Sequence, residues 1–457
     1  MSAPQETRAQ AASPDPLTLI RSRGYVVLLV FGALVGIPVA VVAYGFLALV
    51  SVSQDFAFET LPESMGFESA PVWWPLPVLA LAGLFVGLSL RYFPGTGGHP
   101  PAEGFKSGGS VQARELPGIF VAAFITLALG GVLGPEAPLI LIGGGLAVLM
   151  VHLVKRDAPD QAVLVVGAAG SFAAISTLLV SPLSGAFLML EVVGIGGGLA
   201  SVVLAPGLLA AGIGALCFVG LNSITGWGTF SLALPDIPAA GTPTVAELGW
   251  AVVIGLVAAV LGTAMRRLAL DLQPIIARRK VLLTPAAGLS IGACAVVFDL
   301  LTDKGGEQVL FSGEESLAPL IDHAETWSTG ALVALMVFKG LAYAISLSCL
   351  RGGPTFPGMF IGAAGGVALS QVTDLTLVAA VAMGIGAMTV VMLGGLPLTS
   401  VFITLIFLQA QAADLISVVI VAVVVSWVTS ARLSRWLGGE PAAREPTPAH
   451  EAEPSAR

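Results

Sequence analysis

The feature that most constrains this chain is a series of long apolar stretches that recurs from near its beginning almost to its end. They lie near residues 25–52, 72–92, 116–133, 139–153, 161–180, 183–222, 248–270, 281–300, 329–350, 358–372, 375–395 and 397–431. A helix that crosses a bilayer needs about 20 apolar residues, and several of these stretches are shorter or are interrupted by glycine and proline. The pattern predicts an all-α polytopic membrane protein with tilted and broken helices.

The composition agrees with a surface that faces lipid. Only 11% of the residues are charged and 56% are apolar, whereas about a quarter of a soluble protein is charged. The 56 glycines favour close packing of membrane helices. We therefore expect a multi-pass protein of the cell membrane. No basic patch indicates nucleic acid, and Cys217, Cys294 and Cys349 lie too far apart to indicate a disulfide framework or a metal site.

Charge is distributed unevenly between the apolar stretches. Basic residues gather before residue 25, in the linker 266–280, and at Arg432 and Arg435, whereas acidic residues gather at 55–68 and 299–325. The positive-inside rule predicts that the polar N-terminus (1–24), this linker and the C-terminus are cytoplasmic. The tail 438–457 is rich in proline, alanine and glutamate and is predicted to be disordered. The first apolar stretch is too long for a signal-peptide core, so we expect it to be retained.

Two motifs occur twice. The segment GPEAPLILIG, residues 134–143, aligns with GPTFPGMFIG, residues 353–362, with five of ten positions identical. The segment 182–190 matches 397–405 at nearly the same offset. Two matches in the same order predict two homologous halves, 25–225 and 245–437, with a loop region 226–244 between them. Duplication with broken segments at corresponding places is a sequence indication of a transport site.

The first repeated motif suggests how an anion could bind. Each copy begins with Gly-Pro before an apolar stretch, and proline suits the first helical turn. A helix that starts inside a membrane has unpaired N–H groups and a partial positive charge at that end. Two such ends could hold an anion without a lysine charge and so release it quickly. A single Gly-Pro pair is equally well explained as a break between helices, but its repetition favours the anion site.

Glu136 lies within the first copy of this motif. An ionisable side chain at membrane depth is costly and is a functional candidate. A carboxylate at a helix N-terminus can occupy an anion site and leave it when it is protonated or displaced. Glu136 is therefore predicted to be a gate. The alternative is a carboxylate that only caps its own helix.

On these residues the chain resembles the CLC family of chloride channels and chloride/proton exchangers. Residues 134–138 are similar to the family's Gly-(Lys/Arg)-Glu-Gly-Pro motif, 353–357 to Gly-x-Phe-x-Pro, and 95–100 to Gly-Ser-Gly-Ile-Pro. Residues 182–191 are similar to its Asn-x-Pro-Leu-Ala-Gly helix that ends in glutamate. The resemblance covers about 25–437. It implies an inverted repeat with broken and re-entrant helices, a homodimer with one pore per subunit, chloride or a similar anion as ligand, and no cofactor.

The resemblance also implies an anion-binding site, with departures from the family's pattern. Its residues would be Thr96 or Gly97 at the family's serine, together with Gly134, Ala137, Gly353, Thr355 and Phe356. Thr355 replaces the motif's phenylalanine, and Pro135 and Pro354 have no N–H to donate. The family's central tyrosine has no counterpart in the last helix. Fewer donors predict a wider or more hydrated pathway.

The proton-relay position is altered as well. Exchangers of the family end the corresponding helix with Glu-Glu, whereas this chain has Glu191-Val192. Valine cannot carry a proton, and its presence at this position is typical of the channel branch. Glu191 is either a proton site or a structural acid at a helix end. His99 could sense pH. Lys339 and Arg351 either line the pathway and attract anions, or they snorkel or face the cytoplasm.

These observations favour passive, pH-sensitive conduction of anions, chiefly chloride, with Glu136 as the gate. The alternative is a proton-coupled anion exchanger that uses another inner acid, such as Glu191. A membrane enzyme finds little support, because the sequence contains no metal-ligand cluster, no convincing Ser/His/Asp set and no cofactor loop.

Overall fold

The computed structural model describes Thr18 and residues 20–104, 111–179, 181–193, 198–227, 243–409 and 412–436. These residues form helices and connecting segments, with one isolated antiparallel bridge between Gly134 and Gly353. The predicted all-α fold is confirmed. The tail 438–457, most of the N-terminus 1–24 and most of the loop region 226–244 lie outside the described residues.

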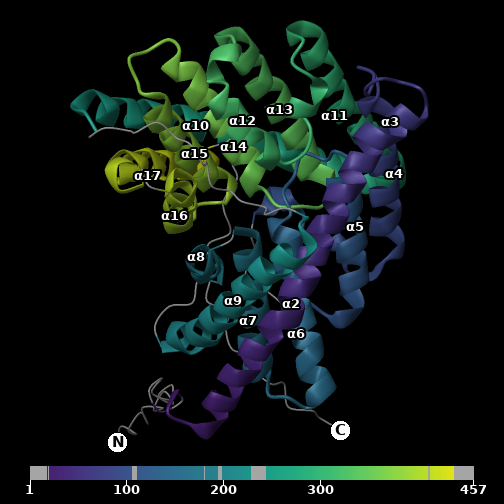
Figure 1. The fold of residues 1–457 in the computed structure, drawn as a ribbon, viewed down its shortest axis with the longest axis vertical. Coiled ribbons are helices and arrows are strands. Elements are labelled where there is room, and N and C mark those ends of the chain that lie inside the picture. The colour runs from purple at the N-terminus through teal and green to yellow at the C-terminus, as the bar shows by residue number, and fades with distance from the viewer. Residues whose placement is uncertain are drawn as a thin grey trace, which may run out of the picture.

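The first half contains long helices separated by short turns (Figure 1). Its elements are α2 (Arg23–Asp55), the π-helix η1 (Phe56–Thr60), α3 (Leu61–Ser64), α4 (Pro75–Tyr92), η2 (Pro94–Gly97), η3 (Pro101–Glu103), η4 (Ala113–Glu115), α5 (Leu116–Ala128), α6 (Glu136–Val154), α7 (Asp160–Leu179), α8 (Pro182–Val193) and α9 (Gly198–Thr225).

The second half has a similar order of long and short helices. Its elements are α10 (Val245–Arg278), α11 (Lys280–Thr302), η5 (Gly306–Gln308), α12 (Glu314–Asp322), η6 (Ala324–Thr326), α13 (Thr329–Cys349), α14 (Thr355–Ser370), α15 (Leu377–Met392), α16 (Pro397–Leu408) and α17 (Ala412–Trp436). Figure 1 shows α2 crossing the molecule, with α10–α17 gathered at its upper end. Nine helices among the described residues are long and apolar enough to cross a membrane.

The two sequence repeats correspond to equivalent helices. Helices α6 and α14 begin at Glu136 and Thr355, the positions that the first repeat aligns, and α8 and α16 begin at the aligned prolines. The rings of Phe187 and Phe402, which are aligned by the second repeat, stack with their centroids 3.8 Å apart and their planes at 15°. Equivalent residues that touch each other indicate a local two-fold axis between the halves, as expected for an inverted repeat.

Glycines allow equivalent helices to cross closely in both halves. A Cβ added to Gly143 of α6 would lie 2.6 Å from the carbonyl oxygen of Gly170 in α7. A Cβ on Gly362 of α14 would lie 2.2 Å from the carbonyl oxygen of Gly384 in α15. Only a residue without a side chain fits at such a crossing, and small residues serve this purpose in membrane proteins.

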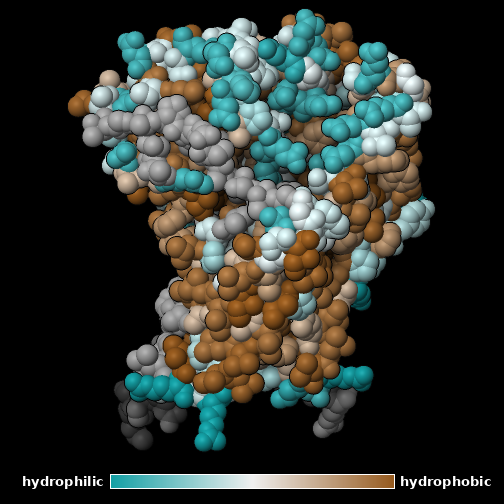
Figure 2. Space-filling model, in the orientation of Figure 1, coloured by the Kyte–Doolittle hydropathy of each residue, from teal (hydrophilic) through white to brown (hydrophobic). Residues whose placement is uncertain are grey.

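The polar ends of the helices form two faces of opposite charge. Helix α2 runs from Arg23 to Asp55, and α11 runs from Lys280 toward Asp303. Figure 2 shows an apolar band with hydrophilic residues at both of its ends. That the basic face is the cytoplasmic one stays a prediction of the positive-inside rule.

The prediction of a linker at 266–280 was wrong. Helix α10 continues to Arg278 and α11 starts at Lys280, so that only Arg279 separates them. Arginine, leucine, alanine and glutamine are all good helix formers, and they extend α10 beyond its apolar part. A cluster of charges in this sequence marks the end of a helix.

Candidate functional site

The two Gly-Pro motifs meet in the interior of the protein. The backbone N–H of Gly134 donates to the carbonyl oxygen of Gly353 at 2.8 Å, and the N–H of Gly353 donates to the carbonyl oxygen of Gly134 at 2.5 Å. Pro135 and Pro354 follow with almost the same backbone angles, φ −81° and −91°. The sequence predicted each proline in the first helical turn, but each lies at the N-cap, one residue earlier. The turn that pairs the two glycines delays the start of each helix by one residue.

The Glu136 side chain lies between the two helix starts. It is 1% exposed, and its Oε1 accepts a short hydrogen bond from the backbone N–H of Thr355, the first residue of α14. Its Oε2 is buried and has no hydrogen-bond partner among the described residues. The carboxylate therefore binds the start of α14, in the other half of the chain. A carboxylate that only capped its own helix, α6, would not make this contact. The Glu136 carboxylate occupies a place that suits an anion.

The structure brings most of the predicted anion-site residues around this carboxylate. A Cβ on Gly134 or Gly353 would lie within about 2 Å of its atoms, and Phe356 packs beside Gly134. Ala137 is half-buried in the first turn of α6. Sequence reasoning missed Tyr343 of α13, which is fully buried and donates from its hydroxyl to the carbonyl oxygen of Pro354 at 2.5 Å. A tyrosine thus reaches the site from a helix where no family motif predicts one.

Thr96 and Gly97 belong to a second cluster. Gly97 is buried, and a Cβ on it would lie 2.9 Å from Leu90 Cδ2 and 3.0 Å from the Ala122 Cβ, so its role is close packing. Arg351 is 7% exposed and donates from Nε to the carbonyl oxygen of Thr96 at 3.1 Å. Because Arg351 precedes Gly353 by two residues, the second cluster adjoins the first.

Several other predicted residues lie apart from the Glu136 carboxylate. His99 is exposed beyond η2. Lys339 is fully buried in α13, and its Nζ donates to the carbonyl oxygens of Gln308 at 2.9 Å and Leu310 at 2.8 Å. Its Nζ also lies 4.5 Å from the centre of the Phe360 ring. Lys339 therefore holds the segment before α12, and neither alternative offered for it describes this position. Among the described residues no group of three His, Cys, Asp or Glu side chains could hold a metal ion.

Glu191 lies at the start of α16. Its Oε1 accepts from the backbone N–H of Leu398 at 2.9 Å, and its Oε2 accepts from the N–H of Thr399 at 2.7 Å. Such contacts satisfy N–H groups that have no partner within the helix, and a negative charge is favoured there. The neighbouring Val192 is buried in the apolar core. This geometry fits the structural alternative for Glu191.

We expect Glu191→Gln to lower the stability of the protein by about 1–2 kcal/mol, because an amide replaces a charged acceptor at a helix N-terminus. Thermal unfolding of the purified protein in detergent measures the change. The exposed Glu325→Gln is the control and should unfold as wild type does. A Glu191→Gln protein of unchanged stability would contradict the structural role.

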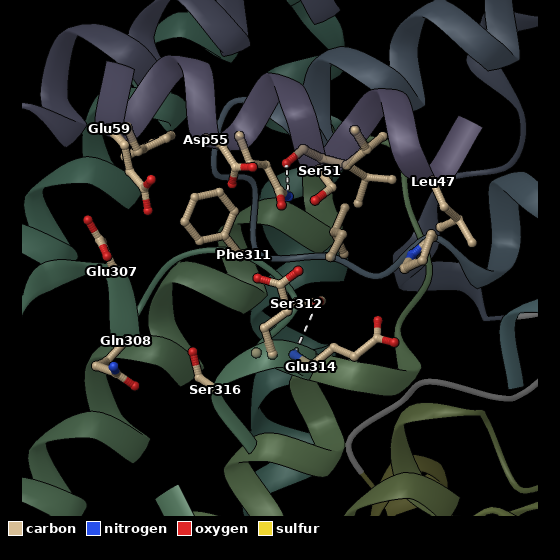
Figure 3. Close-up of a pocket in the computed structure, with 18 residues that line it drawn as sticks. Leu47, Ser51, Asp55, Glu59, Glu307, Gln308, Phe311, Ser312, Glu314 and Ser316 are labelled. Atoms are coloured by element: carbon tan, nitrogen blue, oxygen red, sulfur yellow. Dashed lines mark hydrogen bonds between the residues drawn. The ribbon is translucent and has the colours of Figure 1, made fainter. Parts of the chain in front are cut away.

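A cavity of about 180 Å³ on the acidic side of the protein is lined in part by Pro135. Figure 3 shows Asp55 and Glu59 projecting from α2 and η1 toward Glu307 and Glu314, which come from η5 and the start of α12. Glu315 also lines the cavity. We call it the acidic vestibule. Its lining therefore includes five carboxyl groups, which repel each other when they are charged.

Burial and neighbouring charges raise the pKa values of Glu307 and Glu314 in the acidic vestibule. Burial raises the pKa of Glu314 to about 8, and the charges of Glu136 and Glu315 add to this effect. Burial, followed by the charges of Glu59 and Asp299, raises the pKa of Glu307. The Oε1 of Glu314 has no hydrogen-bond partner among the described residues. Glu314 therefore retains its proton at a pH where exposed carboxyl groups have lost theirs.

These pKa values predict a stability that falls as the pH rises from 4.5 to about 8. In that window the folded protein keeps the proton of Glu314 and the unfolded chain releases it, so a higher pH favours unfolding. We expect the melting temperature of Glu314→Gln to depend less on pH than that of wild type, since glutamine stays neutral. Melting curves across this range, with Glu325→Gln as the control, measure the difference. Equal slopes in wild type and Glu314→Gln would refute it.

Comparison with known proteins places these features in a family. The family model of the voltage-gated chloride channel matches residues 82–431, which is most of the chain. The chain belongs to the voltage-gated chloride channel family. As a CLC protein it is a multi-pass membrane protein, and anion transport is its class of function.

Relatives and solved structures agree with this assignment. The candidate ion-transport protein YfeO of Salmonella paratyphi A is 28% identical over 356 residues, which cover 76% of this CLC chain and 82% of that protein. YfeO of Salmonella typhimurium matches to the same extent. A slow cyanobacterial Cl⁻/H⁺ antiporter has a similar fold, with a TM-score of 0.71 at 20% identity over 90% of this chain and 98% of its own. A CLC-type fluoride/proton antiporter follows with a TM-score of 0.67 at 19% identity, over 89% and 96% of the two chains.

Proposed function

We propose that this CLC protein conducts small anions passively, chiefly chloride, and that Glu136 is the gate. The observation that carries the proposal is the position of the Glu136 carboxylate between the two helix starts, where it accepts a hydrogen bond from the N–H of Thr355. A carboxylate that uses this donor competes with an anion for it. Protonation or displacement of Glu136 would free the donor and open the pathway.

Two residues at the end of α8 support the lack of proton coupling. The side chain of Val192 cannot carry a proton, and both oxygens of Glu191 already accept hydrogen bonds from α16. A proton that reached Glu136 from the acidic vestibule would find neither residue ready to pass it to the opposite face. This arrangement favours conduction in which acid opens the gate and protons are not exchanged for anions.

The second candidate is a proton-coupled anion exchanger with a non-standard inner proton acceptor. Two solved structures of similar fold are described as a chloride/proton and a fluoride/proton antiporter. The acidic vestibule also favours this candidate, because it concentrates protons beside the gate. Fluoride is therefore a second anion to test beside chloride.

We further propose a homodimer with one pathway per subunit, whose basic face is cytoplasmic. Apolar side chains on α9 and α17, including Leu216, Val219 and Ile420, are exposed in the single chain. Such side chains suit either lipid or a second copy of the chain. Light scattering of the protein in detergent would distinguish them, since a mass of one chain would contradict the dimer.

The function is tested by anion efflux from liposomes that hold the purified protein, with the internal pH followed at the same time. Anion flow that needs only a potassium shunt, without stoichiometric proton movement, is the expected result. Protons driven uphill by a chloride or fluoride gradient would establish the exchanger instead. An absence of anion flow would refute both candidates.

A further inference from the structure

A second cavity lies on the basic side of the protein, opposite the acidic vestibule. It has a volume of about 170 Å³ and is lined by residues of η2, α10, α11 and the segment that joins α13 to α14, including Thr96, Gln273, Lys280 and Arg351. Lys280 also lines an adjoining surface cavity together with Arg91, Arg278 and Arg279. We call the 170 Å³ cavity the basic cavity. Lys280 and Arg351 thus line the basic cavity itself, and further arginines line the adjoining one.

Arg351 on that inner wall is buried, and hydrogen bonds compensate its charge only in part. Its Nε and Nη1 donate to the carbonyl oxygens of Thr96 at 3.1 Å and Leu350 at 2.9 Å. Among the described residues, Nη2 of Arg351 donates no hydrogen bond, and no carboxylate forms an ion pair with the guanidinium. Glu103 attracts Arg351 electrostatically without an ion pair between them. Its Oε1 accepts a hydrogen bond from Gln273 at 2.9 Å.

A buried guanidinium with unused donors and no ion pair among the described residues favours the binding of an anion. A guanidinium group has five N–H donors, and two carbonyl dipoles compensate only part of the charge that has lost its water. Removal of a charge from water carries a large penalty, and an opposite charge in contact offsets it best. A small anion can enter the cavity, whereas no described carboxylate of the chain does so. The remaining donors of Arg351 suit such an anion.

We propose that Arg351 binds a small monovalent inorganic anion in the basic cavity, and that Lys280 adds a second positive charge near the entrance. The inference rests on the proposed anion conduction. A site at Arg351 differs from one made only of neutral N–H donors, because the fixed positive charge of the guanidinium raises the affinity for the anion. Two of the donors of Arg351 are already used by carbonyl oxygens, which weakens the attraction enough for the anion to leave.

Chloride binding to the purified protein tests the proposal. Isothermal titration in chloride-free detergent should show saturable binding to wild type, and Arg351→Gln should weaken it by roughly tenfold or more. Arg351→Lys should fall between them, since an ammonium keeps the charge without the planar set of donors. Arg267→Gln is the matched control, because Arg267 is exposed and paired with Asp271 at 3.2 Å. Equal affinities of wild type and Arg351→Gln would overturn the proposal.

A second measurement needs no variant and applies even if Arg351→Gln fails to fold. Crystals of wild type soaked in bromide should show anomalous density in contact with the Arg351 guanidinium, whereas bromide only at other places would overturn the proposal. Efflux from liposomes distinguishes a failure of the proposed function from a failure of the Arg351 site. Wild type without anion flow refutes the proposed function, whereas normal flow with unchanged affinity in Arg351→Gln refutes only the role of Arg351.

Discussion

Glu136→Gln is expected to raise chloride efflux at neutral pH by roughly tenfold, on the view that the carboxylate occupies the pathway most of the time. Glutamine has the shape of the protonated side chain and lacks the charge that competes with an anion for the N–H of Thr355. Acid should then have no further effect, because no proton remains to be gained. Efflux from liposomes at acidic, neutral and alkaline pH measures both changes.

Two neighbouring variants separate the gate from the vestibule. Glu314→Gln removes an acid of the vestibule and leaves Glu136 in place, so its efflux should still rise with acid. The exposed Glu325→Gln should behave as wild type does. If Glu136→Gln responds to acid as strongly as wild type, Glu136 is not the gate.

Gly353→Ala is expected to expel the Glu136 carboxylate from the site. The new Cβ would lie 2.1 Å from Cδ and 2.4 Å from Cγ of Glu136, distances that no pair of non-bonded carbon atoms can adopt. We expect raised efflux that does not depend on pH and a loss of stability of about 1–3 kcal/mol, as for other overpacked sites. Efflux and thermal unfolding of the same preparations measure these effects.

A double-mutant cycle shows whether the effect passes through Glu136. In the Glu136→Ala background the methyl group of Gly353→Ala finds free space, so most of its cost in stability should disappear. Gly330→Ala in α13 is the control, because a Cβ at that position meets no atom within 4 Å. Additive losses in the double mutant would place the strain in the backbone of α14 and not in the contact with Glu136.

The main features of the fold followed from the sequence because they depend on local patterns and on a repeat. Apolar stretches of helical length predict helices, and the alignment of Glu136 with Thr355 predicted that these two positions are equivalent. The structure adds that the two positions are also in contact. The site around them was predicted largely because each half begins its broken helix with the same few residues.

The contacts of Arg351, Tyr343 and Glu314 could not be predicted in the same way. Arg351 meets Thr96 across 255 positions of sequence, and no pattern near either residue names its partner. A charge after an apolar stretch is usually in water, so that Arg351 allowed two interpretations. The polarity of a segment predicts whether it is buried, whereas the partner of a buried charge depends on how distant helices pack.

The paired hydrogen bonds between Gly134 and Gly353 have the form of an isologous contact, in which each side offers the other what it receives. Two identical half-length chains would place the same residue on both sides of this contact. Two glutamates there would bring like charges together, and two threonines would leave the pathway without a titratable group. Fusion of the halves into one chain permits a division of labour, in which Glu136 supplies the charge and Thr355 supplies the donor that receives it.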